Sequence, residues 1–121
     1  MTFNVEVVLR GRDYAKTEAV TIPHGEPSTW KEDAVHDALV EVLRAIDRAQ
    51  HPESPSDKPV ILRGFSWIVE PAEGKVIIAM EIPMGAAVAG PLAIGQAELD
   101  ALITRVLANE RKLHTTPFTV H

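Results

Sequence analysis

The five histidines offer the widest range of chemistry in this chain, and their spacing excludes the common metal motifs. They stand at positions 24, 36, 51, 114 and 121, with no His-x-His, His-x-x-x-His or His-Glu-x-x-His spacing. Glu32 and His36 share one face of a predicted helix, but two ligands do not complete a zinc site. We interpret these two residues as a surface pair, and we predict no metal and no cofactor.

His24 lies in a predicted loop ahead of the first helix, where an imidazole can meet a ligand. A histidine acting as general base needs a substrate and an orienting partner within hydrogen-bond reach. Glu26 is near it in the sequence, but no Ser/His/Asp arrangement can be recognised. We therefore predict His24 as a binding residue and assign no catalytic residue.

Two arginines, Arg10 and Arg63, are each followed by glycine. A planar guanidinium grips carboxylates and phosphates with two parallel hydrogen bonds. Arg63 is therefore a candidate binding residue for an anionic ligand. The alternative is that both arginines are solvated residues at strand ends.

Residues 84–92 are small and apolar, and we expect a loop there. The spacing of Gly85 and Gly90 imitates a P-loop, but Pro91 and Leu92 stand where Lys and Ser/Thr are required. This excludes a P-loop. We predict instead an apolar, partner-binding loop or lid, with Met84 and Val88 as contact residues. The alternative is a loop of small residues that packs closely on the rest of the protein.

Around these residues the sequence predicts an α+β fold of order ββαββα. Alternating apolar residues indicate strands, and apolar spacing of three and four indicates helices. Thr29 and Glu32 have the spacing of a capping box at the start of the first helix. The expected architecture is a four-stranded, mostly antiparallel sheet with two helices on one face. The predicted strands are Phe3–Leu9, Lys16–Ile22, Val60–Val69 and Val76–Ile82, and the predicted helices are 29–50 and Gln96–Lys112.

The chain reads as one domain of 121 residues, with two similar halves at 3–50 and 60–112 and a C-terminal tail at 113–121. Val7 to Gly11 is echoed by Val60 to Gly64, and Ile22-Pro23 by Ile82-Pro83. The echoes favour an internal ββα duplication. Two units formed independently from common parts are the alternative.

One face of the predicted sheet is left without a helix and is strongly apolar. Large exposed apolar surfaces usually mark interaction sites. Trp67 lies on this face in the predicted register, where it would floor a pocket or enter an interface. A bulge at Gly64 would overturn this assignment. The expected face consists of Val8, Ile61, Phe65, Trp67, Ile77 and Ala79.

Composition narrows the class of partner. A net charge of −5 without any basic run argues against nucleic acid. The absence of cysteine excludes disulfides and thiolate chemistry. Residues 1–6 read as a strand and no apolar run is long enough to span a membrane, so we expect a cytoplasmic protein without a membrane partner.

We expect a small binding or assembly domain rather than an enzyme, although the sequence leaves enzymatic activity open. The predicted partner is a second copy, in a homodimer formed through the apolar face and the 84–92 loop. A protein partner and a small apolar or anionic ligand are the other occupants considered. The alternative function is a metal-independent isomerase or lyase, with His24, Arg63 and Trp67 lining a pocket between the sheet and a partner subunit.

Overall fold

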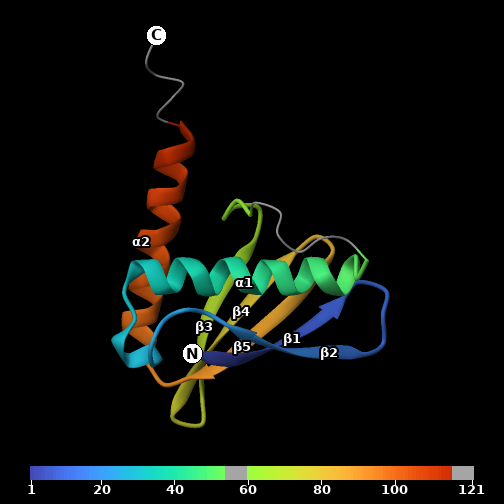
Figure 1. The fold of residues 1–121 in the computed structure, drawn as a ribbon, viewed down its shortest axis with the longest axis horizontal. Coiled ribbons are helices and arrows are strands. Elements are labelled where there is room, and N and C mark those ends of the chain that lie inside the picture. The colour runs from blue at the N-terminus through green and yellow to red at the C-terminus, as the bar shows by residue number, and fades with distance from the viewer. Residues whose placement is uncertain (54–59, 116–121) are drawn as a thin grey trace.

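The computed structural model describes residues 1–53 and 60–115 as an α+β fold of order ββαβββα (Figure 1). Two helices accompany five strands, and a short 3₁₀ helix, η1, precedes the first α-helix. The predicted class and both helices are confirmed, while the predicted strand number is one too few. The elements are β1 (Thr2–Leu9), β2 (Ala15–Thr21), η1 (Pro27–Thr29), α1 (Glu32–Gln50), β3 (Ser66–Ala72), β4 (Lys75–Ile82), β5 (Gly85–Leu92) and α2 (Gln96–Thr115).

The five strands form one antiparallel sheet in the order β2-β1-β5-β4-β3. The hairpin of β1 and β2 forms one edge, and the hairpin of β3 and β4 forms the other. The fifth strand enters last along the chain but occupies the centre. Helix α1 and the chain after it connect the two edges.

The predicted loop at 84–92 is the central strand β5, so the loop prediction is wrong. Ala87 and Ala89 are buried while Ala86 and Val88 alternate with them toward the other face. Small residues hide this alternation, because alanine and glycine give a weak strand signal. They are needed for close packing: a Cβ on Gly85 would lie 2.5 Å from the carbonyl oxygen of Val8.

The third strand begins later than predicted. Gly64 has φ of +80°, a left-handed conformation that interrupts extended chain before Ser66. The strand then continues through Pro71, which an edge strand tolerates because its outer N–H groups need no ladder partner. The shift changes which side chains of this segment face the helices.

Both helices pack on one face of the sheet, as predicted. Figure 1 shows α1 lying across the strands, with α2 beside it. Helix α1 covers β1, β2 and β5, while α2 lies against β3. Alternate strand residues and the apolar faces of both helices join one hydrophobic cluster. Phe3 and Trp30 meet edge to face within it, with ring centres 6.2 Å apart.

The helix ends differ in detail from the predicted ones. Thr29 belongs to η1 and donates its hydroxyl to the carbonyl of Glu26, so the capping box with Glu32 does not form. Helix α2 extends to Thr115 and includes the first three residues of the predicted tail. Residues 116–121, the rest of that tail, lie outside the described residues.

The structure does not show an internal duplication. In the first half, the first strand, β1, is an inner strand and the second, β2, is an edge. In the second half this order is reversed, since β3 is the edge and β4 is inner. Strand β5 also has no counterpart in the first half.

Candidate functional site

Among the described residues, no helix or strand covers the face of the sheet opposite the helices, and this face is apolar at its centre. Ile68 is 51% exposed and Val8 is 43% exposed, although both are strand residues. Between them, Ala79, Ala86 and Val88 are half-buried. We call this surface the open face. Two of its rows, read across four strands, are Ile68-Ala79-Val88-Glu6 and Ser66-Glu81-Ala86-Val8.

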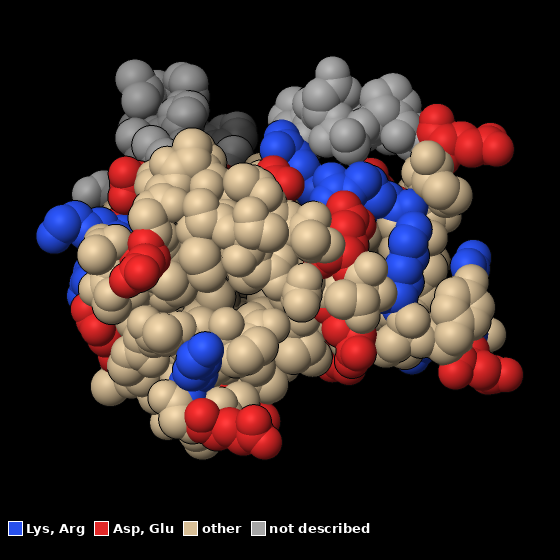
Figure 2. All heavy atoms as spheres, turned by 60° about the horizontal axis from the view of Figure 1, so that its bottom comes forward, with Lys and Arg blue, Asp and Glu red and all other residues tan. Residues whose placement is uncertain are grey.

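Three carboxylates surround this apolar centre. Glu6 lies beside Val88, Glu81 is paired with Ala86, and Glu70 is paired with Ile77. Figure 2 views the molecule from below the strands of Figure 1 and shows a broad uncharged area with acidic and some basic side chains around it. The open face is therefore an apolar surface with an acidic border.

The open face is hollowed toward the turn between β4 and β5. A depression of about 670 Å³ runs from the end of β1 to the segment before β3. A second, of about 350 Å³, lies over Ile68, Ala79 and Val88. Ser66, Glu81 and Ala86 line both, so the two depressions adjoin each other, and we call them together the groove.

Two of the predicted binding residues lie at this face. Val88 is a β5 residue on the groove, and Met84 is 50% exposed in the turn between β4 and β5. Arg63 is exposed beside Gly64, which lines the larger depression. The sequence therefore pointed to this region through the 84–92 segment, although it assigned the wrong element.

Trp67 belongs to the helix side of the sheet, which corrects its predicted place on the open face. It is paired with the buried Met80 and packs against the core. Ile68 takes its place on the open face because β3 starts after Gly64. Val8, Ile77 and Ala79 lie on the open face as predicted. Ile61 and Phe65 precede β3 and belong to no strand.

His24 lies at the opposite end of the sheet from Met84. The amide of Ile22 donates to the carbonyl of Met1, while the amide of Arg10 donates to that of Met84. The nine residue steps between these two ends of β1 span about 30 Å. His24 therefore does not share a pocket with Met84 or the groove.

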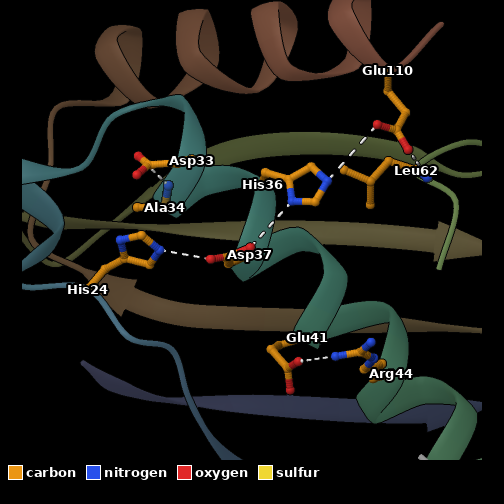
Figure 3. Close-up of polar contacts among 9 residues, drawn as sticks. All are labelled: His24, Asp33, Ala34, His36, Asp37, Glu41, Arg44, Leu62 and Glu110. Atoms are coloured by element: carbon orange, nitrogen blue, oxygen red, sulfur yellow. Dashed lines mark hydrogen bonds and ion pairs between the residues drawn. The ribbon is translucent and has the colours of Figure 1, made fainter. Parts of the chain in front are cut away.

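His24 instead joins a chain of polar contacts in the helix layer (Figure 3). Its Nε2 donates to Oδ2 of Asp37 at 2.8 Å. His36 approaches the other oxygen of this carboxylate with Nδ1 at 3.4 Å. The Nε2 atom of His36 lies 4.0 Å from Glu110, and the Glu110 carboxylate accepts a hydrogen bond from the backbone amide of Leu62 at 3.5 Å. The chain links the loop after β2, both helices and the segment before β3.

Burial by itself raises the pKa of the Asp37 carboxyl, but the contacts with the two histidines outweigh this effect and lower the pKa overall. Hydrogen bonds from His24 and His36, together with charge attraction to both rings, hold this pKa below its ordinary value of 3.8. Asp37 is therefore ionised near neutral pH and acts as a shared acceptor.

The predicted pair between Glu32 and His36 does not form. Glu32 instead accepts a hydrogen bond from Asn109 at 2.9 Å and lies 3.4 Å from Nε of Arg105. Both partners belong to α2. Among the side chains that the structure describes, in residues 1–53 and 60–110, no group of three His, Asp or Glu is arranged to hold a metal ion.

No family model matches this chain, and no curated protein or solved structure matches it either. Of the described residues, neither helix has the length and apolar content required to cross a bilayer. Function is therefore inferred from the geometry alone.

Proposed function

We propose that the protein is a small binding or assembly domain that forms a homodimer through the open face. The observation that carries this proposal is the exposure of Val8 and Ile68 on a sheet face that neither of the described helices covers. Burying apolar surface against a second copy releases about 25 cal/mol per Å². The chain thus has a driving force for association.

The open face is large enough for such an interface. Five strands at the usual spacing and eight residues at the usual rise describe a surface of roughly 24 Å by 26 Å. The flat area, roughly 600 Å², is of the same order as the 800 Å² of accessible surface that each partner contributes to a standard interface. Two antiparallel sheets also pack readily face to face.

The acidic border restricts how two copies meet. A two-fold interface presents the same patch from both sides, so each copy contributes Glu6, Glu70 and Glu81. Carboxylates are costly to bury without a cation. The proposed dimer therefore centres on Val88 and Ala79 and leaves the carboxylates at its solvated rim.

The enzyme alternative receives less support from the geometry. It required His24, Arg63 and Trp67 to line one pocket. His24 lies at the far end of the sheet, and Trp67 packs against the core on the helix side. The binding function is therefore the better explanation of the open face.

The proposal is tested by measuring molar mass with sedimentation equilibrium at tens of micromolar protein. We expect a dimer for the parent chain and a monomer for Ile68→Asp, which adds a charge to the open face. Tyr14→Asp is the matched control, because Tyr14 is 61% exposed in the connection between β1 and β2. A monomeric parent chain, or equal masses for the two variants, would refute the dimer.

A further inference from the structure

Two opposite charges line the 670 Å³ depression at the end of the open face. Arg10 and Glu81 are both among its lining residues. These side chains do not form an ion pair with each other. Among the described residues, neither has any ion pair or side-chain hydrogen bond. Both charges are available to a ligand in the depression.

The sheet register sets the separation of the two charges. Val8 and Glu81 flank Ala86 on its two sides, so they stand two strand spacings apart, about 10 Å. Arg10 follows Val8 by two residues, and its amide donates to the carbonyl of Met84 at 2.9 Å. The guanidinium and the carboxylate therefore approach from opposite sides of β5.

Between the charges, the depression is mainly apolar. Val8 and Phe65 contribute to its lining together with Ile82 and Pro83. Its volume falls within the range of about 300–1,000 Å³ that is usual for small-molecule sites. A ligand that fits these features carries both charges and an apolar body.

We propose that this depression binds a small zwitterion with an apolar side chain, either a free amino acid or a dipeptide. The ligand carboxylate pairs with the Arg10 guanidinium, whose planar fork suits it. The ligand ammonium pairs with Glu81, and the side chain lies against Phe65 and Val8. A phosphate or a simple anion fits less well because Glu81 repels it. The site is built within one chain, so it does not rest on the proposed homodimer.

The test is a titration of the ¹⁵N-labelled chain with L-phenylalanine and, separately, with the dipeptide Phe-Leu, followed by amide shifts. We expect saturable shifts at the amides of Val8, Phe65 and Ala86 at millimolar ligand. The better-bound probe identifies the ligand length. N-acetylphenylalanine and phenylalaninamide each lack one charge and should bind about fivefold more weakly, as expected for the loss of one charged contact.

Two variants test the contact of the ligand carboxylate with Arg10 and that of the ligand ammonium with Glu81. Arg10→Gln and Glu81→Gln should each weaken the binding of L-phenylalanine about fivefold. Glu70→Gln is the matched control, because Glu70 is on the open face but not in the lining of this depression. Three results would overturn the proposal: no shifts with either probe, equal binding of the acetylated probe, or equal effects of all three variants.

The Ile68→Asp variant separates this proposal from the proposed dimer. Ile68 does not line the larger depression. A one-chain site predicts that the monomeric variant keeps or gains ligand affinity, because Val8 lines the depression and also belongs to the proposed interface. Loss of binding on dissociation would contradict a site formed within one chain.

Discussion

The Nε2 atom of His24 lies 2.8 Å from Oδ2 of Asp37, which ties the loop after β2 to the first turns of α1. The two residues are 13 positions apart, with η1 between them. The His24 side chain is 19% exposed and that of Asp37 is 42% exposed. The contact is therefore a partly screened, charge-assisted hydrogen bond that stabilises the chain entry into the helix layer.

The first prediction is a measurable coupling between these two residues. In a double-mutant cycle with His24→Ala and Asp37→Ala, we expect a coupling free energy of about 0.5–1 kcal/mol, reduced from the buried case because Asp37 is partly exposed. Urea unfolding provides the measurement. Asp100→Ala, at an exposed position of α2, is the control with little expected effect. A coupling indistinguishable from zero would show that the contact does not contribute.

The second prediction concerns pH. Because the pKa of Asp37 is lowered in the folded state, the folded chain binds this proton less readily than the unfolded chain. The stabilisation by the ionised carboxylate is thus complete above the unfolded pKa and disappears as pH falls through the folded one. We expect the stability difference between the parent chain and Asp37→Asn to shrink as pH falls below about 4, where the carboxylate takes up its proton. Urea unfolding between about pH 5 and pH 3 measures it, and a difference that grows over this range would contradict the sign.

The third prediction tests the central place of β5. Gly85→Ala should destabilise the chain by about 2 kcal/mol or more, because the new Cβ would overlap the Val8 carbonyl at 2.5 Å. Gly25→Ala is the control, since its Cβ would find only Thr29 Oγ1 at 3.4 Å. Thermal or urea unfolding of both variants gives the comparison. Equal stabilities would be incompatible with close packing of β1 against β5.

The fourth prediction follows from the acidic border of the open face. If two copies meet there, their carboxylates repel, and raising salt should tighten the dimer by screening them. Glu6→Gln should tighten it at low salt and reduce the response to salt. Glu98→Gln, on the helix layer, is the control of equal charge change. Sedimentation at low and high salt measures both effects, and a dimer that weakens with salt would indicate attractive rather than repulsive contacts.

Strong amphipathic patterns explain what could be predicted from the sequence. In β1, buried and exposed residues alternate without interruption, and α1 carries a continuous apolar stripe. In these segments the residue types and the hydrophobic period indicate the same kind of element, so the two helices and the first hairpin were predictable. The uncovered sheet face followed from the same alternation.

The errors come from glycine, alanine and long-range contacts. Gly85 to Leu92 is too rich in small residues to show a strand period, and Gly64 shifts the following register so that Trp67 and Ile68 exchange faces. The contact of His24 with Asp37 depends on the path of the chain through η1, which no local pattern encodes. Arg10 and Glu81 line the same depression only because β5 lies between β1 and β4.

The central position of β5 also has a consequence for synthesis of the chain on the ribosome. Among the described strands, β1 pairs with β2 and β5, and β4 pairs with β3 and β5. Until residues 85–92 emerge, the nascent chain holds two separate hairpins, and an isolated hairpin is marginally stable in water. Assembly of the native sheet must therefore wait until residues 85–92 have left the ribosome. A nascent chain stalled before residue 85 would leave the inner edges of both hairpins open to pairing with other chains.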